Sequence, residues 1–251
     1  MKITIITVCY NSAETIDSAI KSVIEQSYTD IEYIIIDGSS DDDTLKIINN
    51  YSHRISYIVS ERDKGIYDAM NKGISLASGD VIAILNSDDF YLNNAVIADV
   101  IKFFLNNDDL QIVIGNVDFV LPKSLTVSIR LYSSLNFKPW KMRFGFMPAH
   151  PATFIRRSTY EKVGKYNCNY KIAGDFEWFV RAFLVYDIPF IALNKTFVRM
   201  RKGGVSSSGL KSYLTSSQEQ LMALRLNKIY SNILFVLFRL PLKFFLKYIK
   251  Q

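Results

Sequence analysis

The sequence predicts an α/β fold in which helices cover a mostly parallel sheet, and three observations support this prediction. Apolar runs bounded by turn-forming residues recur along the first half of the chain, as in strands with both faces buried. Segments with apolar residues at helical spacing lie between these runs. Every connection between them is short, which is typical of one doubly wound unit.

The elements of the first half follow from this alternation. We expect strands at residues 2–9, 31–36, 55–59, 80–85 and 112–115, and helices at residues 11–26, 41–51, 65–77 and 95–105. The first helix has one apolar face, and the second begins with acidic residues, which the helix dipole favours. Gly73 interrupts the third helix at a cost of about 1 kcal/mol, so we expect close backbone approach there.

The alternation weakens after residue 116. Residues 117–120 and 125–131 predict a β-ribbon, and residues 137–148 predict an aromatic loop bounded by prolines. We expect helices at residues 158–165, 175–185 and 210–230, and a strand at residues 190–198.

Composition and charge limit the class of protein. The 251 residues are 49% hydrophobic and 14% aromatic, which excludes a disordered protein. The chain opens directly on a strand pattern, without the cleavage site of a signal peptide, and Cys9 is expected in the core, so a reducing cytoplasm is the natural compartment. Six basic residues after Glu219 account for the whole net charge of +6, which argues against nucleic acid as a partner.

The segment at residues 232–251 predicts an amphipathic helix on an anionic membrane surface. At about 100° per residue its cations fall within an arc of about 80°, and they are Arg239, Lys243, Lys247 and Lys250. Pro241 should kink the helix, and the charges exclude a transmembrane span. The alternative is a helix docked on the body with a basic face toward solvent.

Acidic residues stand at the ends of three predicted strands, namely Asp37, Glu61 and Asp88. Because the carboxyl ends of parallel strands share one edge, we expect these side chains to converge on one crevice. The apolar run at residues 81–85 ends in a polar cluster that contains Asp88 and Asp89, and two carboxylates there can hold a hard cation that in turn holds a diphosphate. The alternative is a solvated acidic turn.

A polar segment, residues 60–73, leads into the third predicted helix. Gly65 permits a tight entry, and Asp68, Asn71 and Lys72 lie within one turn of each other. The alternative is a solvated helix face.

Four motifs together resemble the family 2 glycosyltransferases, most closely the bacterial members that build O-antigen and related surface polysaccharides. The motifs are Thr7-Val8-Cys9-Tyr10-Asn11, Asp37-Gly38-Ser39-Ser40-Asp41, the run from Glu61 to Gly73, and Asn86-Ser87-Asp88-Asp89. The resemblance covers roughly residues 1–205 and is specific only in combination. It implies the GT-A fold, a Rossmann-like mostly parallel sheet with flanking helices, to which this chain adds the C-terminal amphipathic helix. It further implies a nucleotide-diphosphate sugar donor, a divalent metal (Mg²⁺ or Mn²⁺) and inversion at the anomeric carbon.

The resemblance also assigns roles on the donor side. Thr7, Tyr10 and Asn11, with Glu14 close by, line the nucleotide pocket, while Asp37 binds the base, typically uracil, which favours a UDP-sugar. Asp68 and Asn71 frame the nucleotide and the donor sugar, Asp88 is the metal and diphosphate ligand, and Asp89 contacts a sugar hydroxyl. The chain departs from the family's acidic motif at Asn86, which offers a neutral carbonyl oxygen and weaker metal affinity. One carboxylate is sufficient for magnesium when the donor supplies phosphate oxygens.

The second half must supply a general base, because an inverting displacement needs a group that takes the acceptor's proton. Asp175 matches the family's base motif, and the alternative for it is an N-cap or first-turn carboxylate. Glu177, Trp178 and His150 are expected on the acceptor side, although His150 could also be a loop histidine bonded to backbone. Arg201 or Lys202, in the glycine-rich loop at residues 199–208, is expected to close over the diphosphate.

These expectations combine into one functional prediction. The chain is expected to be an inverting transferase on the inner face of the cell membrane, moving a sugar to a lipid-linked glycan. Residues 1–116 would bind the donor, residues 117–209 the acceptor, and residues 210–251 would form C-terminal helices. The alternatives are a nucleotidyltransferase, which would need a glycine- and basic-rich loop after the first strand, and a non-catalytic nucleotide-sugar binder.

Overall fold

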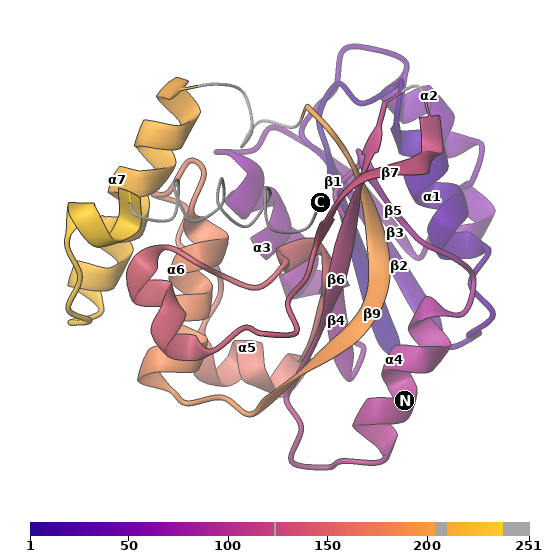
Figure 1. Ribbon diagram of the computed structural model, residues 1–251. Helices are drawn as coiled ribbons and strands as arrows, with labels where there is room; N and C mark the ends of the chain where they lie inside the picture. The colour runs from indigo at the N-terminus through magenta and orange to yellow at the C-terminus, as the bar shows by residue number, and fades with distance from the viewer. Residues whose placement is uncertain (123, 204–209, 238–251) are drawn as a thin grey trace.

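A nine-stranded mixed sheet forms the centre of the computed structural model, which describes residues 1–122, 124–203 and 210–237 (Figure 1). Side by side, the strands run β3-β2-β1-β4-β8-β6-β9-β5, and β7 pairs with β6 outside this path. Their bounds are β1 Ile3–Cys9, β2 Ile31–Asp37, β3 Tyr57–Ser60, β4 Val81–Ile84, β5 Asp89–Tyr91, β6 Ile112–Leu121, β7 Ser124–Tyr132, β8 Thr153–Arg156 and β9 Phe190–Arg201.

The four central strands of the first half run parallel, as the sequence predicts. β1 pairs in parallel with both β2 and β4, and β2 pairs in parallel with β3. Beyond β4 the single strand β8 runs antiparallel, and β6 is antiparallel to β8 and parallel to β9. The carboxyl ends of β1 to β4 therefore lie at one edge of the sheet, where a ligand is expected in an open α/β fold.

Helices cover both faces of the sheet (Figure 1). Helices α1 (Ile16–Ile24), α2 (Thr44–Asn49) and α4 (Val96–Leu105) pack on one face. Helices α3 (Ile66–Leu76), α5 (Arg157–Val163), α6 (Gly174–Val180) and α7 (Leu210–Leu226) pack on the other. Each face has its own cluster of buried apolar side chains, and the second is rich in aromatic rings from α6 and the segment before it.

Gly73 lets α3 lie close to the sheet. A Cβ atom added at Gly73 would stand 2.4 Å from Cγ2 of Ile6 on β1, far inside van der Waals contact. The close approach expected from the mid-helix glycine is therefore present. It fixes the distance between β1 and the helix that carries Tyr67, Asp68 and Lys72.

Several elements differ from their predicted form. β5 and β8 were not predicted, and the two short strands expected at residues 112–115 and 117–120 are one strand, β6. The expected aromatic loop contains a 3₁₀ helix, Pro139–Phe144, and the helix expected at residues 175–185 is α6 followed by a π-helical turn, Arg181–Val185.

The predicted C-terminal amphipathic helix lies mostly outside the described residues. Residues 233–237 are helical, but Arg239, Pro241, Lys243, Lys247 and Lys250 all fall beyond them. Within the described ranges, no helix is both long enough and apolar enough to cross a bilayer.

Candidate functional site

Hydrogen bonds join the loops that follow β1, β2 and β4. The backbone N–H of Asn11 donates to Oγ of Ser40 (2.8 Å), and Oδ1 of Asn11 accepts from the N–H of Asp41 (3.0 Å). Asn11 has a φ of 48°, in the left-handed region that asparagine tolerates better than most residues. The hydroxyls of Ser12 and Ser87 lie 2.8 Å apart. The three loops thus form one continuous surface, which we call the donor edge.

Asp37, at the end of β2, is fully buried beneath the donor edge. Its carboxylate accepts hydrogen bonds from the N–H of Ser40 (3.1 Å), from Oγ of Ser40 (2.5 Å) and from Oγ of Ser60 (2.6 Å). Asp37, which was predicted to bind the nucleobase, thus anchors the loop that follows β2 and ties this loop to the end of β3.

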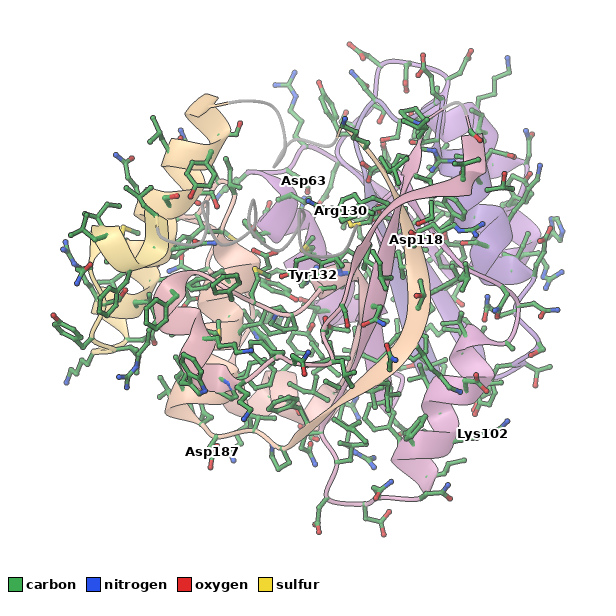
Figure 2. All side chains as sticks on the ribbon, viewed as in Figure 1. Asp63, Lys102, Asp118, Arg130, Tyr132 and Asp187 are labelled. Carbon is green, nitrogen blue, oxygen red and sulfur yellow. The ribbon has the colours of Figure 1, made fainter. Side chains whose placement is uncertain are left out.

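The ring of Tyr10 lies beside Gly38 at the donor edge. A Cβ atom added at Gly38 would stand 3.0 Å from Oδ2 of Asp63 and 3.4 Å from Cδ2 of Tyr10, so the three residues pack tightly. Tyr10 is 62% exposed and presents an aromatic face to solvent. Asp63 lies at the end of the sheet opposite Asp187 and Lys102 (Figure 2). An exposed aromatic ring at this edge is a suitable platform for a planar base.

Lys72 on α3 joins the acidic residues that follow β3. Its ammonium lies 2.9 Å from Glu61, 2.6 Å from Asp63 and 3.8 Å from Asp68. Burial lowers the pKa of Lys72, but the hydrogen bonds to Asp63 and Glu61 outweigh it and raise the pKa above the usual value. The three expected strand-end acids do share one edge, but Glu61 is an exposed partner of Lys72, with 59% of its side chain accessible.

The turn from β4 to β5 holds two carboxylates in different settings. Asp88 is half-buried, and burial raises its pKa against the opposing effects of its own backbone and of the Arg201 guanidinium. Asp89 is fully buried, and burial together with the neighbouring Asp88 raises its pKa well above the ordinary range. The expected sugar contact of Asp89 is therefore wrong, because β5 pairs with β9 and turns this side chain into the protein.

Two buried oxygens in the same turn make no hydrogen bond to the described residues, namely Oδ1 of Asn86 and Oδ1 of Asp89. The amide group of Asn86 donates to Oδ2 of Asp89 at 3.2 Å, so its carbonyl oxygen stays available. A buried polar atom without a partner costs about 1–3 kcal/mol, which a ligand could recover.

The donor set of this turn fits a hard divalent cation. The Asp88 carboxylate and the Asn86 carbonyl oxygen are of the kind that Mg²⁺ and Mn²⁺ prefer. Within the described ranges, no group of three or more His, Cys, Asp and Glu side chains is arranged to hold a metal ion. A cation here would therefore depend on oxygens that the nucleotide supplies.

Arg201, near the end of β9, fixes the shape of this turn. Its guanidinium donates to the carbonyl oxygen of Asp88 and to Oγ of Ser18, both at 2.7 Å, and lies over the ring of Phe90 at 5.0 Å. Burial lowers the pKa of Arg201, and Asp88 opposes that effect. Lys202 is exposed, and residues 204–209 of the expected diphosphate loop lie outside the described residues.

Some predicted donor residues lie elsewhere. Thr7 is fully buried, and its hydroxyl lies 3.0 Å from the Tyr33 hydroxyl inside the core, so it does not line a nucleotide pocket. Asn71 donates to the carbonyl of Tyr166 (2.8 Å) and accepts from its N–H (2.9 Å), which joins α3 to the segment after α5. Glu14 is exposed ahead of α1, and Asp68 accepts from the N–H of Lys64 at 3.0 Å.

The three residues expected on the acceptor side are buried. His150 lies 2.8 Å from the Tyr166 hydroxyl, and burial lowers its pKa to about 4, so it is neutral at physiological pH. Glu177 pairs with Arg181 on the next turn (2.8 Å), and the Trp178 indole donates to the carbonyl of Gly164 (2.8 Å). The expectation was wrong because His150 and Trp178 pack among aromatic rings, while Arg181 holds the buried carboxylate of Glu177.

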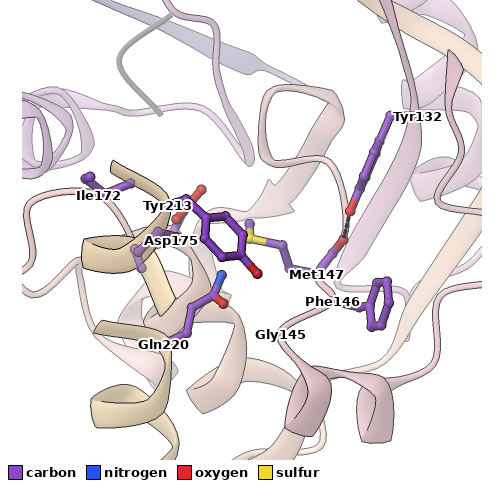
Figure 3. Close-up of a pocket in the computed structure, with 10 residues that line it drawn as sticks. Tyr132, Gly145, Phe146, Met147, Ile172, Asp175, Tyr213 and Gln220 are labelled. Atoms are coloured by element: carbon purple, nitrogen blue, oxygen red, sulfur yellow. Dashed lines mark hydrogen bonds between the residues drawn. The ribbon is translucent and has the colours of Figure 1, made fainter. Parts of the chain in front are cut away.

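A cavity of about 250 Å³ opens beside the N-terminus of α6 (Figure 3). We call it the acceptor cavity. Its lining residues come from β7, the loop before β8, α6 and α7, and they include Tyr132, Phe146, Met147, Asp175, Tyr213 and Gln220. Among the residues that line it, none is Lys or Arg and Asp175 is the one carboxylate.

Asp175 stands in this cavity with a raised pKa. Burial raises the pKa of the Asp175 carboxyl to about 6, while hydrogen bonds from the N–H of Phe176 and from Tyr67 act in the opposite direction. The Tyr67 hydroxyl lies 3.4 Å from Oδ1 of Asp175 and donates at 2.6 Å to the carbonyl of Ile172. A carboxylate with this pKa is well suited to accept a proton near neutral pH.

No sequence pattern indicated that Tyr132 and Tyr213 line the acceptor cavity or that Tyr67 contacts Asp175. Gly174 is part of the reason that Tyr67 reaches Asp175, since a Cβ atom added at Gly174 would lie 2.7 Å from the Tyr67 ring. The glycine beside Asp175 is a signal that could have been used, because glycine often marks close approach.

Comparisons with known proteins give a consistent result. A family model described as Glycosyl transferase family 2 matches residues 4–164. A PGL/p-HBAD biosynthesis glycosyltransferase of Mycobacterium tuberculosis is 28% identical over 183 residues, covering 69% of this chain and 66% of that protein. An uncharacterized glycosyltransferase of the same species is 32% identical over 185 residues, which cover 73% of this chain and 69% of that protein. The Escherichia coli UDP-Glc:alpha-D-GlcNAc-diphosphoundecaprenol beta-1,3-glucosyltransferase WfgD is 32% identical, covering 49% and 48%.

Solved structures of low sequence identity have the same fold. S. aureus TarS 1-349 in complex with UDP-GlcNAc has a TM-score of 0.71 at 17% identity, covering 89% of this chain and 66% of that one. The mannosyltransferase PcManGT from Pyrobaculum calidifontis, in complex with GDP-Man and Mn2+, has a TM-score of 0.64 at 15% identity, covering 89% and 63%. Both neighbours are GT-A glycosyltransferases, and the predicted fold class is confirmed.

Proposed function

The chain belongs to glycosyl transferase family 2, and from that premise we propose that it transfers one sugar from a UDP-sugar to a hydroxyl of a lipid-linked glycan. The observation that carries this proposal is Asp175, a carboxylate with a pKa of about 6 in a cavity beside the catalytic half of the sheet. Burial has given this group the basicity that proton abstraction requires.

The donor is proposed to bind at the donor edge. Tyr10 offers a ring for the base, while Asn11 and the buried Asp37 hold the loops around it. Asp68 would frame the nucleotide from α3, with Glu14 at the rim. A uracil base is favoured by the names of two similar proteins, since the TarS complex holds UDP-GlcNAc and WfgD is named for UDP-Glc.

Asp88 and Asn86 would hold a divalent cation together with the diphosphate of the donor. The cation, when bound, stabilises negative charge on the departing diphosphate. Arg201 keeps the turn in place and adds positive charge next to Asp88, and Lys202 extends that charge toward solvent.

Asp175 acts as the general base in this proposal. The acceptor oxygen attacks the anomeric carbon, the bond from that carbon to the diphosphate oxygen breaks, and the acceptor proton moves to Oδ of Asp175. The product has inverted configuration, because attack and departure occur on opposite faces. General-base catalysis of this kind contributes about 10²–10⁴-fold to the rate.

The acceptor cavity favours an uncharged sugar ring. Tyr132, Phe146 and Tyr213 provide aromatic surface, and the residues that line the cavity include no cationic side chain. A lipid-linked acceptor is proposed because WfgD is named for a diphosphoundecaprenol-linked sugar. Residues 1–116 would then serve the donor and residues 117–209 the acceptor, with α7 adding to the cavity wall.

We place the reaction on the inner face of the cell membrane. This rests on residues 232–251, whose basic and apolar composition suits an anionic lipid surface. A variant ending at residue 231 should then lose binding to vesicles of anionic lipid. Retention of that binding would contradict the assignment.

The decisive experiment compares Asp175→Asn with the unmodified protein. We expect UDP-sugar binding in the presence of Mn²⁺ to be unchanged, while transfer to a lipid-linked acceptor falls by about 10³-fold. Unchanged transfer would exclude Asp175 as the base. Donor binding by both proteins with transfer by neither would instead favour a non-catalytic nucleotide-sugar binder.

A further inference from the structure

A carboxylate on α7 holds the chain just before the proposed base. The side chain of Glu219 accepts hydrogen bonds from three successive backbone N–H groups, those of Lys171 (2.9 Å), Ile172 (2.9 Å) and Ala173 (2.8 Å). The partners lie 46 to 48 residues apart in the sequence. Three charge-assisted bonds to one carboxylate form a strong and directional attachment.

This attachment lies directly before the first turn of α6 and ends at its N-cap residue, Ala173. The first N–H groups of a helix need partners, and a side chain of the N-cap residue normally supplies one. The N-cap residue here is Ala173, which makes no side-chain cap. Asp175 supplies one such partner itself, since its carboxylate accepts from the adjacent N–H of Phe176 while it also lines the acceptor cavity. Glu219 therefore fixes the segment through which the chain enters α6, and with it the place from which Asp175 projects.

The same segment is held from the opposite side by α3. The Tyr67 hydroxyl donates to the carbonyl of Ile172 at 2.6 Å, and the Tyr67 ring packs against Gly174. The backbone of Ile172 is thus held at its N–H by Glu219 of α7 and at its carbonyl by Tyr67 of α3. Asp175 follows three residues later on the first turn of α6, so its position depends on both attachments.

Glu219 also acts on the charge of Asp175. The groups facing Asp175 are Tyr67 from α3, Glu219 and Tyr213 from α7, Tyr132 from β7 and Tyr166 from the segment after α5. Among these described neighbours, Glu219 is the one carboxylate and none is a cation. After burial, its negative charge is a further cause that raises the pKa of Asp175.

We propose that Glu219 is a positioning residue for sugar transfer, which holds Asp175 in the acceptor cavity through the segment at residues 171–173. The inference rests on the proposed role of Asp175 as the base. It places part of the catalytic apparatus on α7, outside the matched family region at residues 4–164.

The test uses Glu219→Gln and Glu219→Ala in the full-length protein, with kcat, donor KM and the pH profile of kcat as readouts. We expect Glu219→Ala to lower kcat by about 10²-fold through misplacement of the base, with donor KM within twofold. Glu219→Gln keeps one acceptor oxygen and loses the charge. The kcat of Glu219→Gln should fall less than that of Glu219→Ala. Because the lost charge raised the pKa of Asp175, the acid limb of the profile, where kcat falls as Asp175 is protonated, should move to lower pH.

Two control variants separate this positioning role from a general effect of substituting α7 or of removing a negative charge. Gln218→Ala changes an exposed neighbour on α7, and Glu161→Gln removes a charge from an exposed pair with Arg157. Both should leave kcat and the acid limb unchanged. Should Glu219→Ala fail to fold, Glu219→Gln decides alone.

Two results would overturn the proposal. One is a kcat of Glu219→Gln within twofold of the unmodified protein at every pH. The other is a reduced kcat with an unmoved acid limb, which would indicate a purely structural role. Full activity of Asp175→Asn would instead overturn the base assignment, so the two failures are distinguishable.

Discussion

Asp88 and Asp175 are two half-buried carboxylates whose charged neighbours differ in sign. Burial raises the pKa of both. Asp88 lies beside the guanidinium of Arg201, which counteracts the effect of burial, while Asp175 lies near the carboxylate of Glu219, which adds to it. Arg201 thus limits the rise in the pKa of Asp88, whereas Glu219 adds to the rise in the pKa of Asp175. One sheet can hold two acids in different roles when the neighbouring charge differs in sign.

On the donor side of this pair, the largest effect should come from Asp88→Asn. Removing the one carboxylate proposed to hold the cation should lower kcat/KM by about 10²–10³-fold, the range for loss of a main electrostatic group. Binding of the UDP-sugar should no longer depend on Mn²⁺, which calorimetry with and without the metal can measure. A donor affinity that still rises with Mn²⁺ as in the unmodified protein would remove Asp88 from the proposed site.

Arg201→Gln should have a smaller effect with a defined pH signature. Without the guanidinium, the pKa of Asp88 rises further, so the carboxylate is protonated at a higher pH. Mn²⁺-dependent donor binding should then weaken about tenfold, as for loss of a group supporting a metal ligand, and its acid limb should move to higher pH. Titrations of donor binding across the pH range test this. An acid limb that moves to lower pH would contradict the comparison.

Tyr67→Phe should give the smallest effect and should oppose that of Glu219→Gln. The Tyr67 hydroxyl lowers the pKa of Asp175, so its loss should move the acid limb of kcat to higher pH. The rate should fall only about two- to fivefold, in line with loss of the hydroxyl's bonds to the Ile172 carbonyl and to Asp175 while the ring keeps its packing against Gly174. The pH profiles of the two variants can be compared directly. If the acid limbs of Tyr67→Phe and Glu219→Gln moved in the same direction, the Tyr67 hydrogen bond and the Glu219 charge would not have opposite effects on the pKa of Asp175, contrary to the prediction.

The first half of the fold was accessible from the sequence because its signals are local. Each buried strand is a continuous apolar run ended by turn formers, so β1 to β4 and the helices between them were predicted close to their observed bounds. Asp88 was predicted at the site for the same reason, since it lies in the polar cluster that ends such a run.

The second half depends on contacts between distant residues, which a local pattern does not encode. β8 is four residues long and takes its place in the sheet from β4 and β6, and the three-residue β5 forms by pairing with β9. Glu219 gave no signal either, because a lone glutamate in a polar helix resembles any exposed side chain. On α6 the sequence could not show which residues of a single turn face the cavity, so Glu177 and Trp178 were misplaced.

The position of β8 has a consequence for how the protein folds. β4 ends at residue 84, but β8, the strand on its second side, comprises residues 153–156. β6 in turn pairs with β9, which comprises residues 190–201. A chain emerging from the ribosome therefore carries β4 as an unpaired edge until about seventy more residues have been made. Pairings over such separations close slowly, because the loop entropy is lost before the contacts form. The nascent donor half would need protection from aggregation during that interval.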